Sequence, residues 1–597
     1  MRDMFIGIFG YAKRYRLMIS LLLCGLSLES FYDVGVRYSI RFIIDRAIAK
    51  SDLLALVLIL GLLAAGAIAF NFIVVACDYW WARIGGKILN DIRFDLFTHM
   101  QSLPINFYRK QSAGDLTARF NADVGQINSG MVLAFPMAVA GTVEIITTLS
   151  LMLLVYPLLA AIAALGIVCS LVLPRMIQNK ALDASFILRR EEGRMMGFLN
   201  ENMGGQSVIK AYCLEDYSSK DFSKRLDVLL SKLVRANFLS YMISSMPNLT
   251  FLALQLVVLG VGGWLAIVGK ITLGGLVAYL MLLIGLGAAI YNLTWTLPSF
   301  IDASAGWRRI CEILREPLGI QDKPDAHDLE HFTGSIHLEN VTFTYPGAES
   351  PALSGVDLKI NAGEYVLFVG RSGAGKSSLI NLILRFYDVI EGRISLDGHD
   401  LRDVTMVSLR SLIGLVSQEI MLFDMSVRDN IRLGALDATD ADIIEAAKAA
   451  EIHEFIMTLP LGYDTAAGTA GLRFSGGERQ RIALARALVR KPAILILDEV
   501  ASALDPTTET QILQTIVRLK GTCTILSITH RLTMAEDADK IVVMRSGGVV
   551  NVGTHESLIG EPGEYLRLWM KDTEDSVPGE TEEQPNIIHE CPASAAV

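Results

Sequence analysis

The 597-residue chain has few cysteines and no excess of basic charge. Its seven cysteines are scattered and no two form a C-x-x-C pair, so neither a thiolate metal site nor a dithiol redox centre is expected. Lys and Arg number 53 against 63 Asp and Glu, and this acidic balance argues against nucleic acid as a partner. The first apolar run lacks a small-residue cleavage site, so we expect no cleavable signal peptide.

Long apolar runs, by contrast, fill the first half of the chain. Six of them approach the roughly 20 apolar residues that span a bilayer. They are Leu17–Val36, Leu53–Asp78, Phe135–Val155, Pro157–Leu173, Met242–Val268 and Leu276–Leu297. The alternative, long buried helices of a soluble protein, is disfavoured by six such runs in succession. The sequence therefore predicts an all-α domain of six transmembrane helices.

Basic residues indicate the orientation of these helices. They gather before the first run, after the second and after the fourth, as Arg2, Lys13, Arg14, Arg16, Arg83, Lys87, Arg93, Arg109, Lys110, Arg119, Arg189, Arg190, Arg194, Lys210, Lys224 and Arg225. Short, less basic loops lie at Tyr156-Pro157 and near Lys270. Because positive loops stay inside, we expect a multi-pass protein of a bacterial inner membrane with both termini in the cytoplasm.

The second half alternates short β-rich runs with helical segments, which is typical of an α/β domain. The predicted strands are Ser335–Asn340, Glu364–Phe368, Ile494–Leu497, Thr524–Ile528 and Ile541–Met544. After Lys571 the chain is acidic and has little apolar surface to bury, so residues 572–597 are expected to be disordered.

A phosphate-binding loop follows the second of these strands. Residues 370–377 read GRSGAGKS and fit the pattern G-x-x-x-x-G-K-[ST]. The glycines let backbone N–H groups turn toward phosphates, Lys376 can reach the β and γ oxygens, and Ser377 can ligate Mg²⁺. The expected ATP-binding residues of this segment are Gly370, Arg371, Ser372, Gly373, Ala374, Gly375, Lys376, Ser377 and Ser378.

Tyr345 lies in the run VTFTYP, residues 341–346, where it is expected to end a strand. An aromatic ring at this place can stack on adenine, whereas the alternative is an ordinary surface tyrosine.

With the sequence SGGE at residues 475–478, these features resemble the ATP-binding cassette (ABC) superfamily, in particular half-transporters of the multidrug and lipid exporter type. The resemblance covers nearly the whole chain except its tail. It implies a multi-domain protein, with an all-α six-helix transmembrane domain joined to an α/β P-loop nucleotide-binding domain. The expected domains are residues 1–315 in the membrane, a linker at 316–333, and the nucleotide-binding domain at 334–571.

The resemblance also assigns roles to residues of the soluble half. Asp498, after the apolar run 494–497, would hold Mg²⁺, and Glu499 would be the general base for hydrolysis, a contribution of roughly 10²–10⁴ in rate. Gln418 would sense Mg²⁺, and His530 would contact the γ-phosphate although a lone histidine is more often structural. Two further groups are implied: Ser502 and Asp505 in a D-loop, and Ser475, Gly476, Gly477 and Glu478 in a signature that caps ATP held by a second chain. The implied cofactors are therefore ATP and Mg²⁺, and the implied partner is a second half-transporter, either an identical copy or a different chain.

Two positions depart from the family's pattern. The signature carries Phe474 and Glu478 where the common form has Leu and Gln, and we expect little loss of activity from either change. Many exporters have a glutamate at the place of Thr469, so the charged contact that this residue usually makes with the cytoplasmic helices is in doubt. The same resemblance places two coupling helices, one within Phe107–Val124 and one at Ala211–Tyr217.

Polar residues at membrane depth are the candidates for substrate contact, because they are costly there. In the first span Glu29, Asp33, Arg37, Arg41 and Asp45 recur every four residues and so follow one stripe. The simpler interpretation is a self-neutralising ladder, with Asp33 facing Arg37 and Arg41 facing Asp45. Glu29 and Glu144 lack a partner within their own helices and could bind a cationic substrate or carry a proton. With Asn292, the candidate cavity residues are Glu29, Asp33 and Glu144.

The sequence thus predicts an ATP-driven transporter that exports or flips an amphipathic drug, lipid or peptide-like molecule across the membrane by alternating access, powered by ATP hydrolysis at two composite sites of a dimer. Membrane lipid is the other expected partner. An importer built on the exporter fold, as for some siderophores, is the nearest alternative. A protein that uses ATP only as a regulatory ligand is less favoured, because every hydrolytic position is intact.

Overall fold

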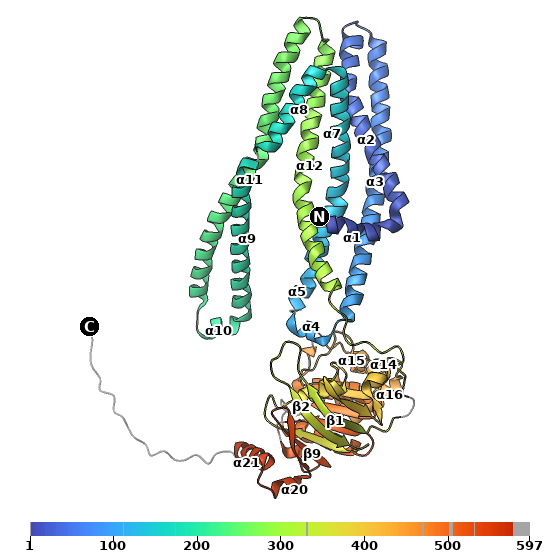
Figure 1. Cartoon of the computed structure of the whole chain (residues 1–597), viewed down its shortest axis with the longest axis vertical. Coiled ribbons are helices and arrows are strands. Elements are labelled where there is room, and N and C mark those ends of the chain that lie inside the picture. The colour runs from blue at the N-terminus through green and yellow to red at the C-terminus, as the bar shows by residue number, and fades with distance from the viewer. Residues whose placement is uncertain are drawn as a thin grey trace, which may run out of the picture. The chain divides into compact units, whose positions relative to one another are not determined.

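The computed structural model describes residues 2–111, 113–173, 175–329, 332–468, 471–500, 506–529 and 532–576. The chain forms two compact units, Met1–Pro317 and Leu318–Val597. The first unit is helical and the second combines helices with two sheets (Figure 1).

Long and short helices build the first unit. They are α1 (Arg2–Ala12), α2 (Arg16–Phe42), α3 (Leu53–Gln101), α4 (Ile105–Lys110), α5 (Ala113–Ala118), α6 (Val124–Asn128), α7 (Phe135–Val155), α8 (Pro157–Val172), α9 (Arg175–Gly204), α10 (Gln206–Ala211), α11 (Glu215–Ile267) and α12 (Leu273–Leu314). A 3₁₀ turn, η1 (Lys13–Tyr15), joins α1 to α2, and three π-helical segments, η2 (Ile43–Ile48), η3 (Arg119–Asp123) and η4 (Ser129–Ala134), interrupt the first and third spans.

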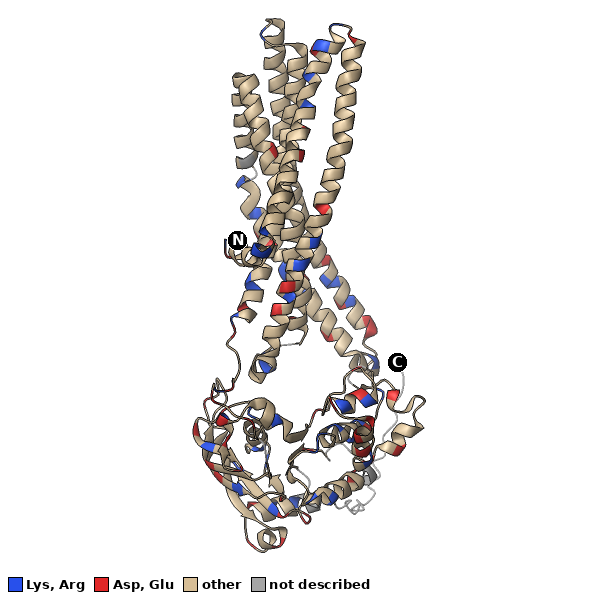
Figure 2. Cartoon of the chain, turned by 90° about the vertical axis from the view of Figure 1, so that its right-hand side faces the viewer, with Lys and Arg blue, Asp and Glu red and all other residues tan. Residues whose placement is uncertain are grey.

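Among the described residues, six helical stretches are long and apolar enough to cross a membrane, which confirms the predicted number. They extend well beyond the apolar runs: α3 has 49 residues and α11 has 53. At about 1.5 Å per residue, such helices are more than twice as long as the ~30 Å hydrocarbon layer is thick. Figure 2 shows that charged residues are sparse in the upper part of these helices and more frequent in their lower part.

The packing of the spans is uneven. α12 contacts α2, α7 and α11, and it carries by far the largest share of buried residues among the six spans. Small residues allow close approach here, since a Cβ at Gly130 of η4 would lie 2.5 Å from Cβ of Ala303 on α12. α9 and α11 pair with each other and, with α10 at their tip, diverge from α12 (Figure 1).

The two short helices of the predicted coupling regions differ in how well they were located. α5, η3 and most of α4 fall within the predicted segment 107–124. The second prediction is wrong by about one and a half turns, because the short helix is α10 and residues 212–214 form the turn into α11. Tyr212 and Tyr217, the aromatic residues of the predicted segment, lie on this turn and on the first turn of α11.

The second unit is layered around a six-stranded sheet of order β10-β9-β3-β8-β7-β6. Its strands are β3 (Tyr365–Val369), β6 (Ile413–Val416), β7 (Ile494–Asp498), β8 (Thr524–Ile528), β9 (Lys540–Arg545) and β10 (Gly548–Gly553). All neighbouring pairs are parallel except β9 with β10. A second, antiparallel sheet has the order β2-β1-β4-β5, with β1 (Ile336–Phe343), β2 (Leu353–Ile360), β4 (Glu391–Leu396) and β5 (His399–Asp400).

Both faces of the parallel sheet are buried, as expected when layers cover each side. Val366 and Phe368 of β3 point to the antiparallel sheet and α13 (Lys376–Ile383). Tyr365, Leu367 and Val369 point to the opposite, helical layer. The helices of the second unit, besides α13, are α14 (Met406–Ser411), α15 (Val427–Arg432), α16 (Asp440–Ala449), α17 (His453–Thr458), α18 (Gly476–Leu488), α19 (Pro506–Leu519), α20 (His555–Ile559) and α21 (Glu564–Ser576), with 3₁₀ turns η5 (Leu401–Asp403), η6 (Gly462–Asp464) and η8 (Leu532–Met534).

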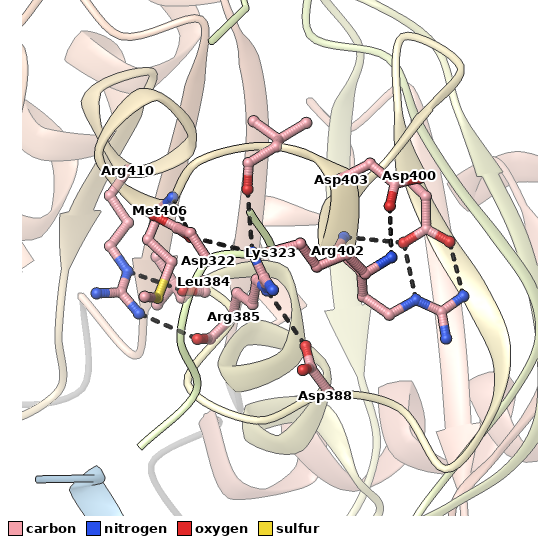
Figure 3. A network of polar contacts seen from close by, with 11 residues as sticks. Asp322, Lys323, Leu384, Arg385, Asp388, Asp400, Arg402, Asp403, Met406 and Arg410 are labelled. Atoms are coloured by element: carbon pink, nitrogen blue, oxygen red, sulfur yellow. Dashed lines mark hydrogen bonds and ion pairs between the residues drawn. The ribbon is translucent and has the colours of Figure 1, made fainter. Parts of the chain in front are cut away.

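The first residues of the second unit are tied to it by polar contacts (Figure 3). Asp322 accepts a hydrogen bond from the Met406 amide at 2.9 Å and lies 3.5 Å from the guanidinium of Arg385, which is 2% exposed. Lys323 pairs with Asp403 at 2.6 Å. The segment predicted as a linker is therefore not a loose spacer along residues 322–323.

Candidate functional site

Four parallel strands bring the predicted nucleotide residues to one edge. The phosphate loop follows β3, Gln418 follows β6, Glu499 follows β7, and the segment leading to His530 follows β8. Because the carboxyl ends of parallel strands lie on the same edge of a sheet, these segments gather there, where α/β folds bind ligands. The register agrees, with Val416 opposite Leu497 and Asp498 opposite Ile528.

The phosphate loop depends on its glycines. Gly370, Gly373 and Gly375 have φ of 153°, 80° and 103°, in the region that side-chain-bearing residues avoid. A Cβ at Gly370 would lie 2.3 Å from the carbonyl oxygen of Met544, so only glycine fits. No such obstacle meets a Cβ at Gly373 within 4 Å. The backbone at Gly373 is thus open on the side where phosphates must approach, and Arg371, Ser372 and Ser377 beside it are exposed.

Lys376 opens α13 and closes back over the loop. Its Nζ donates hydrogen bonds to the carbonyl oxygens of Gly370 at 2.6 Å and Arg371 at 3.1 Å. Burial lowers the pKa of this ammonium, while the charges of Glu499 and Asp498 act in the opposite direction. A buried cation with two carboxylates nearby, which donates to backbone carbonyl oxygens, is suited to a polyanionic ligand such as the phosphates of ATP.

Gln418 and Glu499 contact each other across the strand ends. The Gln418 amide donates to the Glu499 carboxylate at 2.6 Å. Glu499 has φ of 53°, an uncommon conformation for a residue with a side chain and one that occurs at functional sites. With Ser377 and Asp498, these side chains offer hydroxyl, amide and carboxylate oxygens, which are the donors that Mg²⁺ prefers.

Tyr345 is fixed beside α13 and not displayed as a loose surface ring. Its hydroxyl donates to Ser378 Oγ at 3.1 Å and accepts from Asn381 Nδ2 at 3.1 Å. Its ring packs edge-on against Phe343 and Tyr387, with centroids 4.8 and 5.1 Å apart. Sequence reasoning missed Asn381 and Tyr387, because no local pattern relates them to Tyr345.

The signature residues begin α18. Ser475 is its N-cap and Glu478 closes a capping box, with the Ser475 amide donating to Glu478 at 2.8 Å. Either glutamate or glutamine can close such a box, so the departure from glutamine keeps this contact. Phe474 is 6% exposed and packs edge-on against Phe455, so it serves the core.

A buried hub joins α18 to the segment that follows Gln418. Asn430 is completely buried, and its amide donates to the carbonyl oxygens of Phe423 and Met425. Arg486 of α18 donates to the Asn430 carbonyl at 2.8 Å and to the Met421 carbonyl at 2.9 Å. Burial lowers the pKa of the Arg486 guanidinium. Neither residue was singled out from the sequence, since both lie outside the recognised motifs.

Some predicted residues lie outside the part of the chain that the structure describes. These are His530, Ser502, Asp505 and Thr469.

In the first unit, the expected isolation of Glu144 is wrong. Arg37 of α2 forms an ion pair with Glu144 of α7, and Gly285 of α12 leaves room for the guanidinium, since a Cβ there would lie 2.1 Å from it. Arg37 thus pairs with a different helix and not with Asp33 as expected. Glu29 is half-buried, and Asp33 and Asn292 are exposed in the single chain.

The end of the charged stripe at Arg41 and Asp45 is structural. Arg41 and Asp45 pair at 3.7 Å, as the ladder predicts. Asp45 also accepts hydrogen bonds from Thr272 Oγ1 at 2.5 Å and from the Gly274 amide at 3.0 Å. It therefore caps the N-terminus of α12, where a carboxylate is favourable.

Comparisons with known proteins agree with this arrangement. Residues 17–290 match the family model of the ABC transporter transmembrane region, and residues 353–502 match that of the ABC transporter. A relative from Staphylococcus aureus strain NCTC 8325 / PS 47, which bears the provisional name of multidrug export ATP-binding/permease protein, is 36% identical over 518 residues, covering 85% of this chain and 89% of the relative. A protein of the same provisional name from strain bovine RF122 / ET3-1 is equally similar.

A solved structure has the same architecture over nearly the whole chain. It is a bacterial Atm1-family ABC exporter with ATP bound, 26% identical, with a TM-score of 0.79 over 96% of this chain and 99% of that one. The chain therefore belongs to the ABC transporter family, as an ATP-driven half-transporter of the exporter type.

Proposed function

We propose that two copies of this chain form the working exporter, with each ATP held between the phosphate loop of one copy and the signature of the other. The observation that carries this proposal is that Ser475 caps an exposed helix start and, within the described residues, makes no hydrogen bond or ion pair with the phosphate loop. The free turn of α18 presents backbone N–H groups and the positive end of a helix dipole, which favour phosphate.

At each composite site we assign Lys376 to the β and γ phosphates and Tyr345 to the adenine. Ser377, Gln418 and Asp498 would hold Mg²⁺, which when bound neutralises charge on the phosphate oxygens. Glu499 orients the attacking water and accepts its proton as the γ-phosphoryl group leaves. The bond from Gln418 to Glu499 holds this carboxylate at the end of β7 before ligand arrives.

Complementation between two inactive variants tests the composite site. Lys376→Ala and Ser475→Arg chains carry different affinity tags, and mixed dimers are isolated through both tags. Each variant alone should be inactive. A mixed dimer should regain ATP hydrolysis, because one of its sites combines the intact loop of one chain with the intact signature of the other. An inactive mixed dimer, when tagged wild-type dimers are active, would contradict the proposal.

We further propose that both termini and the second unit lie in the cytoplasm, because basic residues such as Lys13, Arg14 and Arg16 flank the first span. Single cysteines introduced at Lys50 and at Lys571 of a cysteine-free chain would report sidedness. A membrane-impermeant maleimide should label position 50 in intact cells and position 571 only after permeabilisation; the reverse pattern would contradict this orientation.

The substrate we propose is an amphipathic organic molecule, and its cationic character is favoured by Glu29. The names of the relatives, which refer to multidrug export, support an organic substrate. Glu29 lies within electrostatic range of Asp33, Asp78 and Glu144, and within the described residues only Glu144 of these three forms an ion pair, with Arg37. Glu29→Gln should therefore reduce transport of cationic dyes more than neutral ones. Equal losses for both classes would remove the basis for a cation site.

A further inference from the structure

A large apolar cavity lies under the N-terminal helix, apart from the nucleotide site and from the candidate substrate residues. Its volume is about 670 Å³, within the range of sites that hold small organic molecules. α1, α2, α3 and the third span line it, with Phe5, Ile84, Ile88 and Phe135 among the lining side chains. Its polar lining is confined to one end of the first span, at Arg16 and Ser20.

The cavity opens onto the lipid-facing surface. Ile6 and Phe9 of α1 line it and remain 64% and 66% exposed, and Leu17 and Leu21 of α2 are exposed beside it. α1 runs across the long spans and not along them, as an interfacial helix does (Figure 1). An occupant can therefore enter from the bilayer without crossing water.

The walls of the cavity are fixed before any occupant arrives. Trp81 donates from its indole to the Val132 carbonyl at 3.1 Å and stacks on Phe135, with centroids 5.6 Å apart. Phe5 packs against Phe135 and Phe300. Such aromatic contacts keep the space open and limit its collapse.

The positive charge beside the cavity indicates the chemical class of its ligand. Arg16 is exposed, and within the described part of the chain its guanidinium has no hydrogen bond or ion pair. Lys13 of η1 adds positive charge one turn away. A guanidinium at the membrane surface above an apolar cavity complements a phosphate joined to an acyl chain.

We propose that this cavity binds one anionic phospholipid of the leaflet that borders α1, with an acyl chain inside and its phosphate on Arg16. The lipid would hold α1 against α3 and the third span, and so act as a structural ligand of the transmembrane domain. The site does not depend on the assignment of the ATP site or of Glu29.

Native mass spectrometry of the intact, delipidated protein in detergent micelles tests the proposal. The probe is phosphatidylglycerol, with phosphatidylcholine of the same chains as the head-group control. Arg16→Ala should weaken binding of the first phosphatidylglycerol about tenfold, the loss of one charge-assisted contact. Arg14→Ala is the matched control, because it removes the same charge from a residue that does not line the cavity, and it should change binding less than twofold.

A second variant, Ser20→Trp, and quenching of Trp81 fluorescence test whether the lipid binds in this cavity. Ser20→Trp should block the mouth and lower binding of phosphatidylglycerol while leaving the unfolding temperature unchanged. Phosphatidylglycerol brominated on its chains should quench Trp81, and Trp81→Phe should remove that part of the quenching. Equal affinity for both lipids, equal effects of Arg16→Ala and Arg14→Ala, or quenching unchanged in Trp81→Phe would each overturn the proposal.

Discussion

At the nucleotide site, the chemistry of single side chains depends on their immediate surroundings. Lys376 shows this, because it sits among carbonyl oxygens with Asp498 and Glu499 in electrostatic range, and burial lowers its pKa below the ordinary 10.5. Only the charged ammonium attracts phosphate. The affinity for ATP is therefore tied to the protonation of one buried lysine.

We predict that ATP affinity falls at alkaline pH. As the pH rises, Lys376 loses its proton at a lower pH than an ordinary lysine, so binding should weaken before pH 10.5 is reached. Lys376→Arg keeps its charge across this range and should bind ATP, if more weakly, with a flat profile. Displacement of a fluorescent ATP analogue between pH 7 and 10 measures the ATP affinity of the wild-type protein and of Lys376→Arg. Parallel profiles of the two proteins would contradict this explanation.

Two variants of Tyr345 separate the contribution of its ring to ATP binding from the contribution of its hydroxyl. Its ring is held by Phe343 and Tyr387, and its hydroxyl by Ser378 and Asn381. Tyr345→Ala should weaken ATP binding by about 1–3 kcal/mol, the value of one base stacked on an aromatic ring. Tyr345→Phe keeps the ring and should lose less. Calorimetric titration with ATP measures the affinity of both variants. Equal losses of affinity would assign the effect to the hydroxyl and contradict stacking on adenine.

At the scale of elements, the sequence predicted the strands and turns of the nucleotide site well. The glycines of residues 370–377 and the apolar runs before Glu499 and Thr529 are local signals, and β3, β7 and β8 lie within one or two residues of their predicted ranges. Features that depend on distant partners were missed. The pair of Arg37 with Glu144 joins residues 107 apart in the chain, so spacing within one helix could not reveal it.

The segment at Asp322 is a second element that sequence reasoning underestimated. It lies in the predicted linker 316–333, but Asp322 contacts Met406 and the buried Arg385, which follows α13 and also donates to the Val404 carbonyl at 3.0 Å (Figure 3). The end of the phosphate-loop helix and the chain entering the second unit are therefore joined by one arginine.

We predict that Asp322→Ala destabilises this junction. Removing one partner of a buried, charged hydrogen-bonding group costs about 1–3 kcal/mol. The full-length variant should unfold at a lower temperature and be cleaved faster by protease near residue 322. Asp325→Ala, an exposed aspartate on the same segment, is the control and should leave both unchanged. The same unfolding temperature for both variants would show that the Asp322 contact adds no stability.

At the scale of the whole molecule, composition and motifs were sufficient to predict six spans joined to a nucleotide-binding unit. The unequal burial of the spans was not predictable in the same way. α12 is largely buried, whereas α9 and much of α11 expose large apolar side chains such as Phe186 and Phe238. Such surfaces on a single chain mark an interface with lipid or protein, which agrees with a dimer as the working form.

The central claim is that this chain is an ATP-hydrolysing motor with Glu499 as its base. We would measure ATP hydrolysis by the chain purified alone in lipid nanodiscs, beside Glu499→Gln. We predict turnover by the wild-type protein and a loss of about 10²–10⁴-fold in the variant, with ATP binding retained. Turnover that persists in Glu499→Gln, or ATP bound by the wild-type protein without turnover, would contradict a self-sufficient motor built on this residue.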